Sequence, residues 1–168
     1  MIDWNVTIKK RWLVIGDSNL SRIPPFQIPD LQIDSFPGAS FSHAEAILKK
    51  AVISSKVEKV VLAFGLNNRE QRCKDTAIKQ LQRTVKAAKD KLPYAEIWVP
   101  EINFSRGLPI HQQEILEGLN RYINSHTGYI PPLPGADFEV ERDKIHWTAD
   151  TGKAMLQHWA KQLNCIAP

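Results

Sequence analysis

The sequence has few cysteines and no long apolar run, and each shortage excludes a class of protein. Only two cysteines, Cys73 and Cys165, occur in 168 residues. They are far apart and in no metal-binding spacing, which excludes a disulfide-rich scaffold and a cysteine zinc site. No apolar stretch approaches the roughly 18 residues of a membrane span, and the first residues lack the apolar segment of a signal peptide. We therefore expect two free thiols, no transmembrane segment, and an intracellular, cytoplasmic protein.

The remaining composition is that of one ordinary folded domain. Hydrophobic residues make up 43% and charged residues 24%, close to the globular average, and the length suits a single core. The net charge of +4 permits contact with RNA or anionic lipid without requiring it. We expect residues 1–10, which are mostly polar, to be a leader or linker from a larger protein. Residues 11–168 are then the domain, and no cofactor or metal is expected.

Apolar runs and helix-period stripes alternate along the chain. The apolar runs predict strands at residues 11–15, 31–36, 57–64 and 95–99, with a short fifth strand at 138–140. Helices are expected after a capping box at residues 42–45, over 75–92, over 109–128, and after the cap Thr148. This alternation predicts an α/β fold. The expected form is a three-layer α/β/α sandwich of the flavodoxin-like kind, around a mostly parallel five-stranded sheet.

The turn at residues 16–20, Gly-Asp-Ser-Asn-Leu, has the clearest chemical meaning. It follows the apolar run 12–15, so Ser18 stands where a buried strand turns towards a helix. Backbone N–H groups at such a turn point up beside the serine, which makes Ser18 a candidate nucleophile. The tripeptide Gly-Asp-Ser is also common as an ordinary Asx or Ser turn without a catalytic role. Whether Ser18 is a nucleophile or a turn residue depends on which side chains the other loops bring to the same edge of the sheet.

Three further loops follow predicted strands, and ligand sites of parallel sheets lie at these carboxyl ends. His146 is a candidate base, and Asp143, three residues before it, can orient the imidazole. The N–H groups of Ser18 and Gly38 and the side-chain amide of Asn67 could hold a developing oxyanion. Taken singly, Gly38 and Asn67 are ordinary turn residues, and the Asp-x-x-His spacing is common.

Four sequence blocks stand in order along the chain: Gly-Asp-Ser-Asn-Leu at residues 16–20, Gly38, Gly-Leu-Asn at 65–67, and Asp143-x-x-His146. Taken together, these four blocks resemble the SGNH, or GDSL-like, hydrolase family, over about residues 11–164. The resemblance implies a three-layer fold and ester hydrolysis through an acyl-enzyme. It assigns Ser18 as nucleophile, His146 as base and Asp143 as the orienting carboxylate. The oxyanion hole it implies consists of Ser18, Gly38 and Asn67. Many members have Asp after the third-block Asn, whereas this chain has Asn68. We expect that difference to change loop support only.

The segment Gly-Asp-Ser-Asn-Leu-Ser-Arg-Ile-Pro at residues 16–24 is similar to a narrower group. It looks like the esterase domain in the first open-reading-frame protein of fish-type non-LTR retrotransposons. This resemblance implies a small-molecule or lipid-like acyl ester as substrate. It also implies RNA association through other domains of the full-length protein.

The alternative is a catalytically weak or inactive SGNH-fold module that binds RNA or lipid. Phosphate contacts would then come from the basic side chains Arg69, Arg72, Lys74, Lys79, Arg83 and Lys86. The same cluster is also typical of a solvated helix face. A module that only binds has little reason to keep Ser18, Asn67, Asp143 and His146 together, so the sequence favours the enzyme.

Overall fold

The computed structural model describes residues 3–164, and its centre is a five-stranded sheet in which every pairing is parallel. Across the sheet the order is β3, β2, β5, β6 and β7. The strands are β2 (Trp12–Gly16), β3 (Leu31–Ser35), β5 (Lys59–Ala63), β6 (Glu96–Pro100) and β7 (Tyr129–Ile130). The predicted parallel α/β fold is therefore confirmed.

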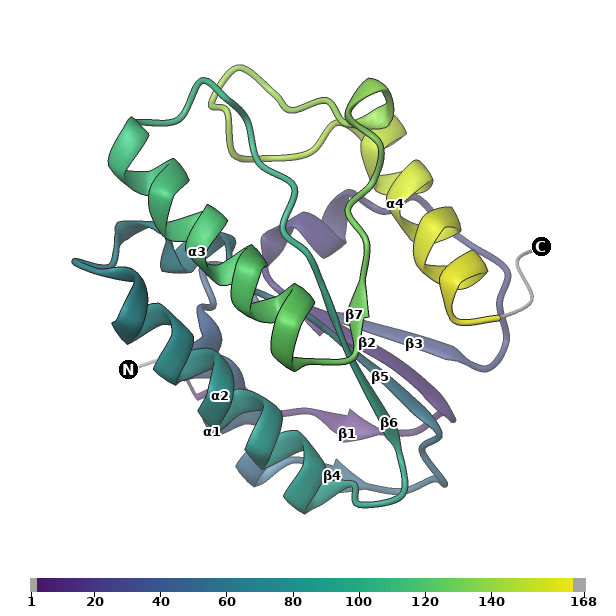
Figure 1. Ribbon diagram of the computed structural model, residues 1–168. Helices are drawn as coiled ribbons and strands as arrows, with labels where there is room; N and C mark the ends of the chain where they lie inside the picture. The colour runs from purple at the N-terminus through teal and green to yellow at the C-terminus, as the bar shows by residue number, and fades with distance from the viewer. Residues whose placement is uncertain (1–2, 165–168) are drawn as a thin grey trace.

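Four α-helices within the described residues cover the two faces of this sheet (Figure 1). They are α1 (Phe41–Lys50), α2 (Lys74–Lys91), α3 (Ile110–His126) and α4 (Ala149–Gln162). Helices α1, α2 and α3 share one apolar cluster with one face of the sheet, whereas α4 belongs to a second cluster on the other face. This is the predicted three-layer arrangement. None of the helices in the described part of the chain is both long and apolar enough to cross a membrane.

Strand β2 shows why the sheet forms where the sequence predicts it. Its five residues are all buried, and their side chains alternate between the two faces, as the period of a strand requires. Leu13 and Ile15 pack in the cluster with α1 and α2, while Trp12 and Val14 pack in the cluster with α4. An uninterrupted apolar run is what a strand covered on both faces needs.

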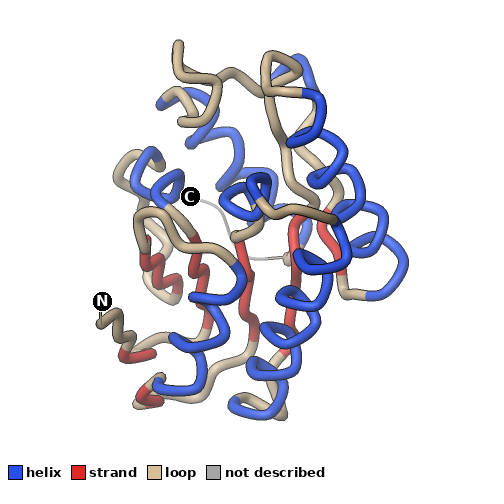
Figure 2. The backbone as a smooth tube through the Cα atoms, turned by 90° about the vertical axis from the view of Figure 1, so that its left-hand side faces the viewer, coloured by secondary structure: helices blue, strands red, loops and turns tan. Residues whose placement is uncertain are grey.

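Part of the stretch that we expected to be a leader or linker, residues 1–10, packs with the domain. Strand β1 (Thr7–Ile8) pairs in parallel with β4 (Val52–Ile53), apart from the main sheet (Figure 2). Val6 and Ile8 are buried in the larger apolar cluster. Two-residue strands leave no detectable alternation in a sequence, which is why neither was predicted. Of the two expected free thiols, Cys73 is exposed and Cys165 lies outside the described residues.

The fifth strand was predicted in the wrong place. Residues 129–130 form β7, whereas the predicted stretch 138–140 contributes only an isolated antiparallel bridge from Val140 to Trp147. Pro131 and Pro132 follow β7 directly and have no N–H to extend the ladder. The strand is therefore too short to show a pattern in the sequence.

Helix α1 begins earlier than the capping box at residues 42–45 indicates. Its cap is Ser40, whose backbone N–H donates to Nδ1 of His43 at 3.0 Å. Ser42 instead shares a hydroxyl hydrogen bond with Ser40, and Glu45 pairs with Lys49 at 2.8 Å. Phe41, the first helical residue, is buried, so the helix starts where it places this side chain in the core. The other helices lie within two residues of their predicted bounds, and Thr148 caps α4 as expected.

Candidate active site

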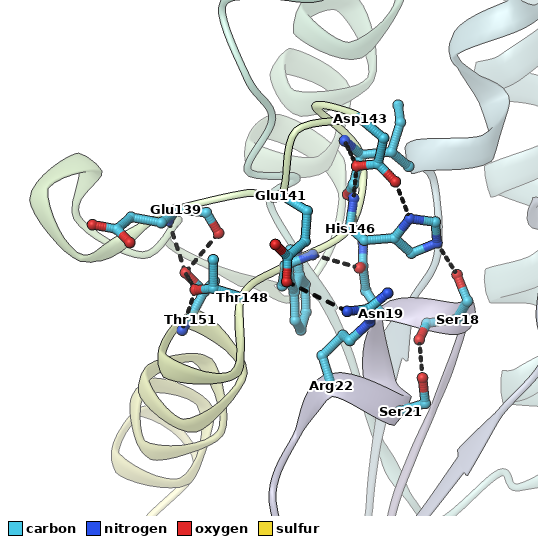
Figure 3. Close-up of polar contacts among 12 residues, drawn as sticks. Ser18, Asn19, Ser21, Arg22, Glu139, Glu141, Asp143, His146, Thr148 and Thr151 are labelled. Carbon is cyan, nitrogen blue, oxygen red and sulfur yellow. Dashed lines mark hydrogen bonds and ion pairs between the residues drawn. The ribbon is translucent and has the colours of Figure 1, made fainter.

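Ser18 lies directly beyond the carboxyl end of β2. A short 3-10 helix, η1 (Ser18–Arg22), starts there, and the side chain of Asp17 caps it by accepting from the Asn19 N–H at 3.0 Å. This cap fixes the turn and leaves the half-buried Ser18 hydroxyl facing the loop before α4. In that direction Ser18 Oγ lies 3.3 Å from Nε2 of His146 (Figure 3).

His146 is joined to Asp143 on its other side. Nδ1 of His146 donates to Oδ2 of Asp143 at 2.5 Å, and because a carboxylate only accepts, Nε2 is left to accept from Ser18. The second carboxylate oxygen, Oδ1, accepts from the backbone N–H groups of Ile145 and His146 at 2.9 and 3.0 Å. The His146 side chain and these N–H groups hold the pKa of Asp143 well below its usual value. The carboxylate is thus charged at neutral pH and faces the imidazole.

The base-bearing loop is held to the nucleophile turn by Asn19, a residue for which the sequence predicted no role. Asn19 Nδ2 donates to the Ile145 carbonyl at 3.2 Å, and its Oδ1 accepts from the Trp147 N–H at 2.9 Å. The amide is therefore hydrogen-bonded to the backbone on both sides of His146. Asn19 is only 3% exposed, so this link is shielded from competing water. The only sequence signal was its place next to Ser18.

The turn that carries Asp143 contains a backbone conformation that favours glycine. Lys144 has a φ of 65°, and its N–H donates to the Glu141 carbonyl at 3.0 Å. The next two N–H groups, of Ile145 and His146, then both point at Asp143. A non-glycine residue is uncommon at such a φ, and such residues gather at functional loops.

Asn67 contacts the loop that carries Gly38, at the same edge of the sheet. The loop after β3 starts beside the Ser18 turn, since the Phe36 N–H donates to the Gly16 carbonyl at 2.8 Å. Gly38 has a φ of 79°, and open space surrounds the position where a Cβ would stand. Asn67 Nδ2 donates to the Ala39 carbonyl at 3.0 Å. The second and third blocks are therefore adjacent.

Asn68 is fully buried and takes a supporting position, as its difference from the family pattern led us to expect. Its Oδ1 accepts from the Phe41 N–H at 3.0 Å, and its Nδ2 donates to Gln80 Oε1 at 2.7 Å. The side chain thereby ties the start of α1 to α2. It leaves the neighbouring Asn67 amide on the side of the Gly38 loop.

Asp17 is a buried acid next to the nucleophile. It is 5% exposed, and burial raises its pKa to about 6. The Asn19 N–H and the nearby side chains of His146 and Arg69 act in the opposite direction. Among residues 3–164, no group of three His, Cys, Asp or Glu side chains is arranged to hold a metal. The reactive groups of the site are therefore a hydroxyl, an imidazole, two carboxylates and amides.

The sequence matches no family model and no curated protein. Solved structures do share its fold. A GDSL-like lipase from Bacteroides thetaiotaomicron superposes with a TM-score of 0.73 at 13% identity, covering 92% of this chain and 88% of the lipase. A carbohydrate esterase of family 3 from Talaromyces cellulolyticus gives 0.66 at 14% identity, covering 95% and 96%. The catalytic domain of peptidoglycan O-acetyltransferase A from Streptococcus pneumoniae gives 0.63 at 16% identity, covering 94% of each chain.

The chain has the SGNH hydrolase fold. These structures cover 92–95% of the chain, so the match concerns the complete sandwich and not one βαβ unit.

Proposed function

We propose that this protein is a serine hydrolase of carboxylic esters that works through an acyl-enzyme. One observation carries the proposal. Ser18 Oγ, His146 and Asp143 form a continuous hydrogen-bonded chain, 3.3 Å and 2.5 Å in its two links, at the carboxyl edge of the sheet. Nucleophile, base and orienting carboxylate in that order are what activates a serine.

In the first half-reaction Ser18 Oγ attacks the ester carbonyl carbon while its proton passes to His146 Nε2. Asp143 stabilises the resulting imidazolium through Nδ1. The tetrahedral intermediate collapses, His146 returns the proton to the departing alcohol oxygen, and the acyl group stays on Ser18. In the second half-reaction a water gives its proton to His146 Nε2 and attacks the acyl carbon. The second tetrahedral intermediate collapses, His146 returns that proton to Ser18 Oγ, and the acid is released.

The oxyanion of each tetrahedral intermediate is proposed to face Ser18, Gly38 and Asn67. Ser18 and Gly38 would offer backbone N–H groups, and Asn67 would offer Nδ2. The contact of Asn67 with Ala39 supports this assignment, because it keeps the amide beside the Gly38 loop. Preorganised donors of this kind act where the charge develops and commonly supply a large share of the rate enhancement.

The proposed substrate is a small or lipid-like acyl ester. The support is an apolar groove of about 340 Å³ that begins at Ile23, directly after η1, and whose lining includes none of Ser18, Asp143 and His146. Its apolar lining consists of Ile23, Pro24, Pro25, Phe26, Ile28, Leu156 and Ala160. A groove of that volume suits a small apolar group. Placement in a cytoplasmic retrotransposon protein, with RNA association through other domains, rests on the sequence of residues 16–24.

A binding module without catalysis is the second proposal, and the surface offers it less support than the sequence did. Of the basic side chains counted for phosphate contacts, Arg69 turns inward to the Leu66 carbonyl and to Asn67. Lys86 pairs with Asp90 at 2.6 Å. The remaining basic residues of that cluster are exposed on and near α2.

Hydrolysis of p-nitrophenyl acetate, butyrate and laurate by wild type and Ser18→Ala tests the proposal. We expect Ser18→Ala to lower kcat by about four to six orders of magnitude, as in other serine hydrolases, with an unchanged melting temperature. Ser125→Ala, which removes an exposed hydroxyl on α3, is the matched control and should keep full activity. Ser18→Ala activity within tenfold of wild type would contradict the assignment. Wild type that turns over none of the esters but binds RNA or anionic vesicles would favour the binding module.

A further inference from the structure

The side-chain amide of Asn67 is held at both ends. Its Nδ2 donates to the Ala39 carbonyl at 3.0 Å, and its Oδ1 accepts from Nη1 of Arg69 at 3.2 Å. A carbonyl can only accept and a guanidinium can only donate, so these two partners allow one orientation of the amide. One Nδ2 hydrogen is used by Ala39, and the second remains for another acceptor.

Arg69 turns towards Asn67 instead of solvent. It lies in the 3-10 helix η2 (Leu66–Glu70), and the same Nη1 also donates to the Leu66 carbonyl at 3.2 Å. Its Nε is shielded from solvent and meets no acceptor among residues 3–164. A buried donor without a partner is unfavourable, so the hydrogen bonds of Arg69 alone do not explain this orientation. Arg72, three residues on, is exposed.

The charge of Arg69 also reaches the nucleophile turn. Burial raises the pKa of Asp17, the neighbour of Ser18, and the Arg69 guanidinium is one of the groups that partly offset this rise. Arg69, which contacts Asn67 in the same 3-10 helix, is therefore close enough to the nucleophile turn for its charge to act there. A cation at that point favours negative charge near it.

We propose that Arg69 is a positioning residue that orients and polarises the Asn67 amide for oxyanion stabilisation. This inference rests on the proposed ester hydrolysis. The hydrogen bond from the guanidinium to Oδ1 is charge-assisted, and it draws electron density towards the oxygen. The free Nδ2 hydrogen thereby becomes a better donor, since hydrogen bonds in series polarise one another. Arg69 acts through Asn67 and itself touches no reacting atom.

A double-mutant cycle tests this coupling. We expect Arg69→Met to lower kcat about 10- to 100-fold with KM within about threefold, a smaller effect than the 100- to 1000-fold of losing the oxyanion donor in Asn67→Ala. In the Asn67→Ala background, Arg69→Met should change kcat by less than about twofold, because the group it acts through is gone. Arg72→Met removes the same charge from an exposed neighbouring position and should leave kcat unchanged. Equal losses from Arg69→Met in both backgrounds would overturn the proposal.

The Asn67 side-chain amide signal in a ¹⁵N–¹H spectrum gives a readout that needs no substrate. The signal is assigned by its disappearance in Asn67→Ala. We expect Arg69→Met to shift it and Arg72→Met to leave it in place. If it does not move in Arg69→Met, the proposed contact has no effect on the amide and the inference is wrong. If wild type hydrolyses no ester while the signal moves, the proposed function fails and the positioning contact stands.

Discussion

The two sides of the Ser18–His146 hydrogen bond are built in different ways. On the nucleophile side, the neighbours Asp17, Asn19 and Leu20 are 5%, 3% and 3% exposed, and the turn grows directly out of β2. On the base side, residues 141–144 are exposed, and the Asp143 side chain is 47% exposed. Burial and the Asp17 cap therefore position the nucleophile, whereas hydrogen bonds of exposed residues position the base.

The two sides are therefore sensitive to different substitutions. Moving the nucleophile requires disturbing buried residues, so such changes lower stability together with activity. The base loop depends on a few polar contacts, chiefly the Asn19 amide, the Glu141 N–H to the His146 carbonyl at 2.7 Å, and the Asp143 carboxylate. Substitutions there can abolish activity while leaving the fold intact. Three predictions test this contrast.

The largest effect is expected from Asp143→Asn on the base side. The Asn side chain can donate its N–H₂ to Nδ1 of His146, and this favours the tautomer of His146 that carries its proton on Nε2. In that tautomer Nε2 cannot accept the hydrogen bond from Ser18. In serine proteases the equivalent change lowers kcat about 10⁴-fold, and we expect a loss of about 10³- to 10⁴-fold in p-nitrophenyl acetate hydrolysis. The melting temperature should stay within about 2 °C, since the side chain is exposed.

Asp90→Asn is the matched control for that prediction. Asp90 is an exposed carboxylate on α2 that pairs with Lys86, so the same loss of charge should leave kcat unchanged. A fall of the Asp143→Asn melting temperature by 10 °C, with kcat within tenfold of wild type, would show that packing and not hydrogen bonding depends on Asp143.

A smaller effect on kcat is expected from Asn19→Ala, which cuts the link between the two sides. The Ile145 carbonyl and the Trp147 N–H lose their partner, and His146 is no longer held opposite Ser18. We expect kcat to fall about 10- to 100-fold, because small displacements of catalytic groups have effects of this size. The free energy of unfolding should fall by about 1–3 kcal/mol, since buried polar groups are left unpaired.

Asn120→Ala separates these two consequences of Asn19→Ala. The Asn120 side chain, on α3, also makes two hydrogen bonds to the backbone: Nδ2 donates to the Ile102 carbonyl at 2.9 Å, and Oδ1 accepts from the Ile102 N–H at 2.7 Å. Its loss should lower stability to a similar degree with kcat within about threefold of wild type. If both variants lose activity equally, general loosening of the fold explains the effect, and Asn19 has no particular role in placing the base.

The elements that the sequence predicted well are those with a long, one-sided or uninterrupted apolar pattern. Strands β2 and β5 are continuous apolar runs because helices cover both of their faces. Strands β1, β4 and β7 have two residues each, too few to show a period. Their pairing is decided by which chain segments meet in space, and this information is spread over the whole sequence.

The site divides in the same way. Asp143 and His146 could be proposed together because three residues of chain join them, and Ser18 because its turn directly follows a strand. Asn19 was missed because its partners lie 126 and 128 residues away. Arg69 was assigned to a basic surface because the direction of its side chain depends on how η2 is folded. Local spacing thus indicates the reacting groups, whereas the groups that hold them require the tertiary structure.

The last prediction concerns stability and not turnover: Asp17 tests the packed side of the site by pH. Its pKa is about 6 in the fold and about 3.9 in an unfolded chain. Because folding raises this pKa, the stabilising contribution is fully present below about pH 4 and is lost as pH rises through 6. At pH 8 the fold must hold a buried charge, at a cost of roughly 2–3 kcal/mol relative to pH 4.

Asp17→Asn removes that charge and keeps an oxygen to accept from the Asn19 N–H. The free energy of unfolding of the variant relative to wild type should therefore rise by about 2–3 kcal/mol between pH 4 and pH 8. Urea denaturation at the two pH values measures this difference, with Asp90→Asn as the exposed control. A difference that stays constant across this range would mean that Asp17 keeps its charge without cost. In that case the polar groups around it, and not burial, would control its ionisation.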